Sequence, residues 1–160
     1  MERNTPNEIV EIYAITPDRL IQKKLELLEL KKGEILYDLG SGDGQCLIQA
    51  CQEYNTNGIG YELLPHAIEL SKKNIEKAGF LDKIEIRKES FMNIQFKEMT
   101  ALILYLNRNV LGKLSLKLET ELPIGARIVT HDFDLPAWEP RKVVDFTING
   151  LITKIYLYQR

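Results

Sequence analysis

The chain has 160 residues, of which 44% are hydrophobic and 28% charged, and its formal net charge at pH 7 is -2. This length suits one domain whose core needs no disulfide or metal, and the charge argues against the large basic surface of nucleic-acid-binding proteins. No apolar run reaches the roughly 18 residues of a membrane span, and the N-terminus lacks a signal-peptide core. We therefore expect a cytoplasmic, single-domain protein that is not embedded in a membrane.

The first element that we expect is a helix within the segment "ITPDRLIQKKLELLEL". Thr16 can cap it, Pro17 suits the first helical position, and Asp18 favours the helix dipole. The apolar residues that fall on one helical face are Leu20, Ile21, Leu25 and Leu28. Gly33 is expected to end this element.

Downstream, strand-like segments alternate with helical ones. The strand-like segments are residues 34–39, 57–63, 83–88, 101–107 and 126–133. The helical segments are residues 42–54, 65–79 and 110–122. This alternation indicates βαβ units and a mostly parallel sheet that is covered by helices on both faces.

The C-terminal segment, residues 142–159, holds two β-rich runs joined by Asn149-Gly150, which is a strong hairpin signal. Too few residues precede this segment for a crossover helix, so the sheet should finish with an antiparallel pair. How the hairpin joins the sheet stays open. The expected architecture is a single-domain, Rossmann-like α/β fold with an N-terminal segment and helix (1–33), a parallel βα core (34–133) and a hairpin (141–160).

A glycine-rich loop, "LYDLGSGDGQ" at residues 36–45, follows the first expected strand. In an open α/β sheet, ligands bind beyond the carboxyl ends of the strands, near the switch in strand order. Glu62 ends the next strand, and its distance from the loop is close to the ~20 residues expected of an acid that binds ribose hydroxyls. The loop and Glu62 together favour a ligand with an adenosine-like half.

The charges around this loop help to choose the ligand. In dinucleotide fingerprints, written G-x-G-x-x-G, a pyrophosphate lies at the helix N-terminus, whereas here the third glycine comes one position early, at Gly44. The carboxylates of Asp38 and Asp43 would be unfavourable beside a phosphate. Beside an ammonium or a sulfonium they are favourable, since opposite charges at ~4 Å gain about 1–4 kcal/mol near a surface. S-adenosylmethionine meets these requirements; the alternative for the glycines alone is a tight turn without a ligand.

The two cysteines, Cys46 and Cys51, are five positions apart in an expected helix. This spacing suits neither a zinc site nor a redox CxxC pair. We expect reduced cysteines and no metal.

Two stretches resemble a known superfamily. "YDLGSGDG" followed by "GIGYEL" is similar to motif I and its acidic partner in class I (seven-strand) S-adenosylmethionine-dependent methyltransferases. "YAITP", "LYLN" and "ELPIGARIVTHDFDLPAWEP" resemble a narrower group, the archaeal broad-specificity protein-lysine methyltransferases and the mitochondrial enzymes that methylate a lysine of the ATP synthase c subunit. The resemblance runs from about Tyr13 to the C-terminus and implies a protein-lysine N-methyltransferase.

The resemblance also implies a set of cofactor-binding residues. Tyr13 and Thr16 would lie in an N-terminal loop that closes over the methionine end of S-adenosylmethionine. The residues around the methionine and sulfonium would be Leu36, Asp38, Leu39, Gly40, Ser41, Gly42, Gly44 and Gln45. Glu62 and its neighbour Leu63 would bind the ribose side.

The adenine side departs from the family pattern. Ser90 and Phe91 match the place where the family often has an acid followed by an apolar residue beside the adenine. Since Ser90 replaces that acid, Glu89 is the alternative partner of the adenine amino group. Asn107 matches the end of the fourth strand, next to the transferred methyl group and the cofactor.

Methyl transfer from a sulfonium is an in-line displacement, so positioning supplies much of the catalysis. The lysine acceptor has a pKa of ~10.4 and is almost wholly protonated at pH 7, but an apolar channel would lower this pKa by desolvation. We expect no essential general base, with Tyr13, Tyr105 and Asn107 acting as channel walls and hydrogen-bond partners. His131 and Asp132 could reach the site, or could simply end the fifth strand.

The expected partners are proteins that present exposed lysines, bound by a monomer without stable nucleic-acid binding. A nucleic-acid methyltransferase is a rival interpretation, but adenine-modifying enzymes carry an "NPPY"-like motif where this chain has "LNRNVL". A small-molecule methyltransferase and a non-catalytic S-adenosylmethionine-binding module also remain as hypotheses. A nicotinamide-dependent oxidoreductase is disfavoured by the glycine spacing and by Asp38.

Overall fold

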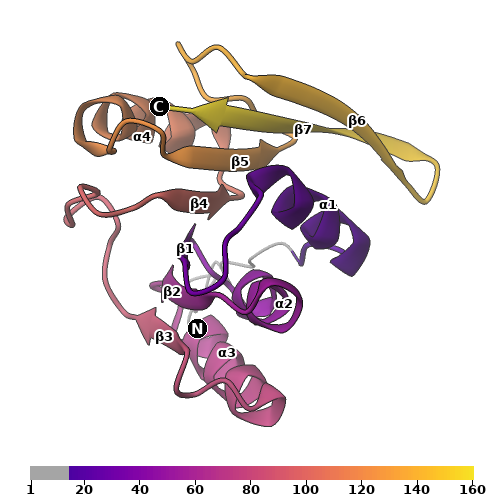
Figure 1. The fold of residues 1–160 in the computed structure, drawn as a ribbon, viewed down its shortest axis with the longest axis vertical. Coiled ribbons are helices and arrows are strands. Elements are labelled where there is room, and N and C mark those ends of the chain that lie inside the picture. Colours follow the sequence, from indigo (N-terminus) through magenta and orange to yellow (C-terminus); the bar gives the residue numbers. More distant parts are fainter. Residues whose placement is uncertain (1–14) are drawn as a thin grey trace, which may run out of the picture.

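The computed structural model describes residues 15–160, which form one sheet flanked by helices (Figure 1). Tyr13 lies outside the described residues. The helices are α1 (Asp18–Leu28), α2 (Gln45–Tyr54), α3 (Pro65–Ala78) and α4 (Arg108–Glu121). The strands are β1 (Ile35–Leu39), β2 (Asn57–Tyr61), β3 (Ile84–Arg87), β4 (Ala101–Leu104), β5 (Arg127–His131), β6 (Lys142–Ile148) and β7 (Leu151–Gln159).

The strands form a 7-stranded sheet in the order β3-β2-β1-β4-β5-β7-β6. The first five strands are parallel, and β1 lies between β2 and β4, so the strand order reverses there. The predicted α/β fold is confirmed. The open question about the hairpin is also answered, because β7 pairs antiparallel with β5 and leaves β6 at the edge.

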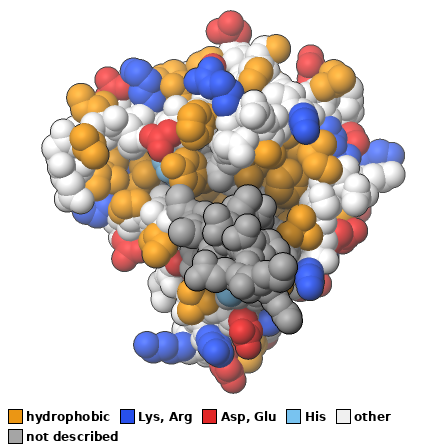
Figure 2. Space-filling model, turned by 180° about the vertical axis from the view of Figure 1, so that it is seen from behind, with side chains coloured by type: hydrophobic (Ala, Val, Ile, Leu, Met, Phe, Trp, Pro, Cys, Tyr) orange, Lys and Arg blue, Asp and Glu red, His pale blue; other side chains and the backbone are white. Residues whose placement is uncertain are grey.

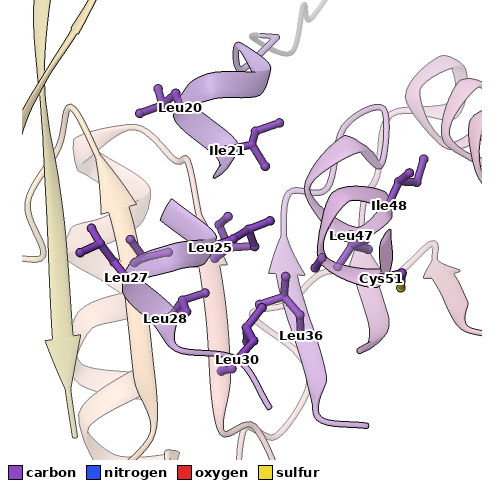
Figure 3. Packing of buried hydrophobic residues seen from close by; sticks show 14 of the residues in the cluster. Leu20, Ile21, Leu25, Leu27, Leu28, Leu30, Leu36, Leu47, Ile48 and Cys51 are labelled. Carbon is purple, nitrogen blue, oxygen red and sulfur yellow. The ribbon is translucent and has the colours of Figure 1, made fainter. Parts of the chain in front are cut away.

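Helices cover both faces of the sheet. The helices α1, α2 and α3 lie along one face and α4 along the other (Figure 1). The pleat of β1 separates the two cores, because Leu36 packs with α1 and α2 on one face, whereas Tyr37 packs in the cluster of α4. Figure 3 shows Leu36 facing Leu25 and Leu47 in the first of these cores. The carboxyl ends of the parallel strands are thereby held at one edge.

Two details of α1 differ from the sequence-based expectation. Pro17, with φ -60° and ψ 142°, is itself the N-cap and no side chain caps the helix, so the prediction that Thr16 caps it is wrong. The helix ends at Leu28 rather than near Gly33, because Glu29 takes the left-handed conformation with φ 50°. This early stop turns the chain so that Leu30 joins the core.

The boundaries of α2 and α4 depend on backbone and cap geometry. The helix α2 begins at Gln45 instead of residue 42, because Gly42 and Gly44 have φ values of 53° and 81°. The helix α4 begins after Asn107, whose side-chain oxygen accepts a hydrogen bond from the Val110 N–H at 3.0 Å. At the hairpin turn, Asn149 and Gly150 both have positive φ, as a two-residue turn of type I′ requires. Within residues 15–160, no helix is both long and apolar enough to cross a bilayer.

Candidate functional site

A cavity of about 530 Å³ lies beyond the carboxyl ends of β1, β2 and β4, where the strand order reverses. Its volume is in the range of small-molecule binding sites, and its position is the one at which open α/β sheets bind ligands. The sequence-predicted residues on its wall are Thr16, Asp38, Gly40, Ser41, Gly42, Gln45, Glu62, Leu63, Glu89, Phe91, Tyr105 and Asn107.

The glycine loop is anchored to the end of β2 by its backbone. The N–H groups of Gly40 and Ser41 both donate to the carbonyl oxygen of Tyr61, at 2.8 and 3.0 Å. Gly60 allows this approach, since a Cβ on it would come within 2.6 Å of Ser41 Oγ and 2.7 Å of Ser41 Cβ. The backbone therefore fixes where the cavity wall runs before any ligand binds.

Three of the predicted cofactor-binding residues around the glycine loop do not line the cavity. The side chains of Leu36 and Leu39 are fully buried in the two cores and are not among the residues that line the cavity. Gly44 does not line it either, because a Cβ there would meet Ser71 Cβ of α3 at 3.2 Å. The lack of a side chain at Gly44 serves the packing of α2 against α3.

Glu62 is held rigidly at the end of β2. Its Oε2 atom accepts a hydrogen bond from the Gly42 N–H at 2.9 Å, and Oε1 accepts from the N–H groups of Leu63 and Leu64 at 2.8 and 3.0 Å. The side chain is buried yet lines the cavity. A carboxylate has about four acceptor sites, so capacity is left for a ligand hydroxyl.

Asp38 and Lys24 form a buried charged region at the mouth of β1. Burial raises the pKa of the Asp38 carboxyl to about 8; the Lys24 ammonium opposes this shift, and Glu62 and Asp43 add to it. Burial lowers the pKa of Lys24. The Lys24 ammonium donates to the Leu104 carbonyl oxygen and lies 3.0 Å from His131 Nδ1.

Sequence reasoning missed Lys24, although a signal was present. Lys24 lies three positions after Ile21 and four before Leu28, so it interrupts the apolar face of α1. A lysine on the buried face of an amphipathic helix indicates either a specific partner or a ligand. The wall also includes Phe133 and Val110, which carry no sequence signal of a ligand site.

On the adenine side that the sequence predicted, Glu89 and Phe91 line the cavity, whereas Ser90 does not. The Ser90 hydroxyl instead accepts a hydrogen bond from the Met92 N–H at 3.3 Å. Of these two neighbours, which the sequence left as alternatives, Glu89 is thus the one that lines the cavity.

At the opposite end, side chains at the ends of β4 and β5 pack on one another. The Tyr105 ring stacks on the His131 ring with centroids 3.9 Å apart, and the Tyr105 hydroxyl donates to Asp132 Oδ2 at 3.2 Å. The Thr153 hydroxyl of β7 donates to the other oxygen of Asp132. Burial, and then the Lys24 charge, lower the pKa of His131 to about 2, so its imidazole is neutral.

The residues on the wall fit S-adenosylmethionine. Glu62 offers acceptor capacity for a ribose, and four carboxylates, those of Asp38, Asp43, Glu62 and Glu89, face a space suited to a cationic ligand. The buried Ser41 Oγ has no hydrogen-bond partner among residues 15–160. No group of His, Cys, Asp or Glu in that part of the chain could hold a metal ion.

Comparison with known proteins reveals close relatives. A family model described as the ANTKMT methyltransferase domain matches residues 38–142. The chain is 33% identical over 147 residues to a protein-lysine N-methyltransferase of Saccharolobus islandicus, and the match covers 91% of each protein. It is 32% identical over 142 residues to the adenine nucleotide translocase lysine N-methyltransferase of Mus musculus, covering 89% of this chain and 62% of the mouse protein.

A solved structure is also similar over nearly the whole chain. It is the crystal structure of an RNA methyltransferase from Salinibacter ruber in complex with S-adenosyl-L-homocysteine. The two structures superimpose with a TM-score of 0.84 at 33% sequence identity, and the match covers 91% of this chain and 93% of the other.

Proposed function

Because the chain belongs to the ANTKMT methyltransferase domain family, we propose that it is a protein-lysine N-methyltransferase that uses S-adenosylmethionine. The observation that carries this proposal is the 33% identity to the Saccharolobus protein-lysine N-methyltransferase over 91% of both proteins. The chain spans only 62% of the mouse relative that acts on the adenine nucleotide translocase. The particular substrate of that relative is therefore not part of the proposal.

The cofactor follows from the site and from the Salinibacter structure, which contains S-adenosyl-L-homocysteine, the product left after methyl transfer. When bound, S-adenosylmethionine supplies an electrophilic methyl group on a sulfonium. Glu62 would accept a hydrogen bond from a ribose hydroxyl. The wall residues that would surround the methionine end are Thr16, Gly40, Ser41, Gly42, Asp43 and Gln45. Leu63 would lie on the ribose side next to Glu62, and Glu89 and Phe91 would enclose the adenine.

The acceptor lysine would enter between the ends of β4 and β5. Tyr105 and Phe133 present aromatic surface there, and Asn107 lies on the wall while it caps α4. An apolar wall favours the neutral amine of the acceptor because desolvation penalises its charged form. We expect no essential general base among the wall residues, as the sequence predicted.

The rival function is RNA methylation, which the description of the Salinibacter structure favours. The net charge of -2 speaks against it, since RNA binding relies on basic surfaces. On the face shown in Figure 2, lysine and arginine side chains are scattered among acidic ones instead of forming one basic patch. Protein-lysine methylation is therefore the better supported function.

Further parts of the proposal concern the whole protein. It would act as a cytoplasmic monomer on proteins with exposed lysines, without forming stable complexes with nucleic acid. Its single domain would consist of an N-terminal cofactor-covering segment and helix (1–33), the βα core (34–133) and the hairpin (141–160).

The deciding experiment is incubation of the protein with methyl-labelled S-adenosylmethionine and, in separate reactions, a lysine-rich protein mixture, RNA and DNA. We expect label in protein, with mass spectrometry locating methyl groups on lysine side chains. Glu62→Gln is the matched control for cofactor-dependent transfer. Label in RNA alone would replace this proposal with the rival function.

A further inference from the structure

Lys24 is a buried cation with no role in the function proposed so far. Its side chain is 1% exposed, yet it lines the cavity. Within residues 15–160 no carboxylate forms an ion pair with its Nζ atom. Burying a lysine ammonium without a paired anion is unfavourable because its charge is desolvated. An anion on a bound ligand would offset this desolvation penalty.

The charges on the wall are strongly unequal. Among the described residues that line the cavity, Lys24 is the single basic side chain, and it shares the wall with four acidic ones. S-adenosylmethionine carries two positive groups, the sulfonium and the α-ammonium, and one negative group, the α-carboxylate. A lysine ammonium would repel the first two and attract only the third.

The position of Lys24 agrees with this pairing. Thr16, Ile21 and Lys24 all reach the cavity from one segment of the chain, and Cys46, beside Lys24 and Asp38, lines it from the start of α2. Glu62, the predicted ribose partner, lies at the end of β2 on one side of β1, whereas Lys24 contacts Leu104 at the end of β4 on the other side. The methionine end of the cofactor would therefore extend towards α1.

The ammonium of Lys24 also has a donor to spare. It has three hydrogens, and among residues 15–160 two acceptors are occupied, the Leu104 carbonyl oxygen and His131 Nδ1 at 3.0 Å each. These two contacts hold Nζ over the end of β4. The third hydrogen can then be donated into the cavity.

We propose that Lys24 is a cofactor-binding residue that receives the α-carboxylate of S-adenosylmethionine, while Asp38 faces its α-ammonium. The inference rests on the proposed cofactor and adds the group that recognises its acidic end. Burial lowers the pKa of Lys24 and raises that of Asp38 in the free protein, so each side chain gains when an opposite charge arrives.

The test compares two ligands by isothermal titration calorimetry: S-adenosylmethionine and its decarboxylated analogue, which lacks only the α-carboxylate. Both are titrated into the wild-type protein, into Lys24→Met and into Lys23→Met, the latter changing a neighbouring lysine that pairs with Glu26 on the surface. In the wild type, we expect the carboxylate to add about 10- to 100-fold in affinity. Lys24→Met should lose this preference without weakening the analogue, whose two positive groups are then no longer repelled by the lysine, whereas Lys23→Met should behave as wild type.

Each contrary outcome has a distinct meaning. Equal affinity of the wild type for both ligands overturns the role of Lys24, and this comparison does not depend on any variant folding. If Lys24→Met is folded, as its thermal unfolding would show, and binds both ligands more weakly by the same factor, then Lys24 has a structural role and the proposal is also overturned. Unchanged cofactor affinity with reduced turnover would assign Lys24 to the acceptor instead. Failure of the wild type to bind S-adenosylmethionine at all would refute the proposed function itself.

Discussion

The two halves of the cavity are built by different means. The cofactor half lies at the ends of β1 and β2 and is held by backbone hydrogen bonds. Among them are those that the N–H groups of Gly40 and Ser41 donate to the Tyr61 carbonyl oxygen. At the ends of β4 and β5, the acceptor half is held by side chains, with Tyr105, His131 and Asp132 packed on one another. A backbone-built half can hold one constant ligand, whereas a side-chain-built half can change with the substrate.

Among the variants proposed, Glu62→Gln should have the largest effect, which is a loss of affinity for S-adenosylmethionine. The amide would lose the charge that strengthens hydrogen bonds to ribose hydroxyls, and it would turn one donor towards the N–H groups of Gly42 or Leu63. We expect the affinity for S-adenosylmethionine to fall about 100-fold, measured by calorimetry. Glu69→Gln on the exposed surface of α3 is the control. An affinity within about twofold of wild type would show that the ribose lies elsewhere.

Gly60→Ala tests whether the backbone of this half is tightly fitted. The new Cβ would come within 2.7 Å of Ser41 Cβ, and neither atom can rotate away. We expect the free energy of unfolding to fall by about 1–3 kcal/mol in urea titrations.

The matched control for Gly60→Ala is Gly112→Ala in α4, where a Cβ meets nothing within 4 Å. Alanine should stabilise that helix by up to about 1 kcal/mol, since glycine is a poor helix former. We therefore expect Gly60→Ala to lower the free energy of unfolding and Gly112→Ala to raise it. If both variants are stabilising, the glycine loop can move to accommodate a Cβ at residue 60, and the cofactor half is not fixed by its backbone.

The same contrast explains what the sequence could predict. The glycine loop and Glu62 lie close together in the chain, and short-range backbone rules connect them, so the sequence could place both at one end of the sheet. The strand and helix order followed from hydrophobic alternation, and the hairpin from Asn149-Gly150. Motif membership did not show that the side chains of Leu36 and Leu39 point into the two cores, nor that Gly44 packs against α3.

The acceptor half was predicted less well for a physical reason. The contact between His131 of this half and Lys24, the proposed cofactor-binding residue, joins residues 107 positions apart, and the contact between Tyr105 and Asp132 depends on the pairing of distant strands. No local pattern encodes such contacts before the sheet order is known. Asn107 shows the same limit, since its capping of α4 depends on where that helix begins.

The acid sensitivity of the acceptor half offers a measure of its burial. His131 is enclosed by Lys24, Tyr105 and Asp132, and its pKa in the folded protein falls to about 2. Below pH 6.5, this histidine is therefore protonated in the unfolded chain but stays neutral in the folded one. The free energy of unfolding should therefore fall by about 1.4 kcal/mol per pH unit on this account as the pH drops below 6.5. Above pH 6.5, His131 is neutral in both the folded and the unfolded chain, so this loss of stability is absent.

His131→Asn isolates this contribution, because the asparagine oxygen can still accept from Lys24. Asp38, with its pKa raised to about 8, gives the opposite slope between roughly pH 4 and 8, but it is present in both proteins. Between pH 6 and 4.5, the free energy of unfolding of the variant relative to that of the wild type should rise by about 1.4 kcal/mol for each unit by which the pH is lowered. Parallel curves in urea titrations would mean that His131 is hydrated and titrates normally.

Tyr105→Phe, with the smallest expected effect, tests the boundary between the halves. Phenylalanine keeps the stack on His131, whose ring centroid lies 3.9 Å away, but it removes the hydroxyl that donates to Asp132. Losing one such hydrogen bond corresponds to about 0.5–1.5 kcal/mol, which is roughly a 2- to 13-fold loss of turnover on a protein substrate. The calorimetric affinity for S-adenosylmethionine should stay within about twofold, because that hydroxyl belongs to the acceptor half.

The matched control for this last variant is Tyr54→Phe at the end of α2, which removes a hydroxyl far from the cavity wall. Turnover and cofactor affinity should both be unchanged there. If Tyr105→Phe instead weakens cofactor binding as much as turnover, then side chains of β4 and β5 also hold the cofactor, and the two halves are one unit. A loss confined to turnover means that the acceptor half can be altered while the cofactor stays bound, which is what a change of protein substrate between relatives requires.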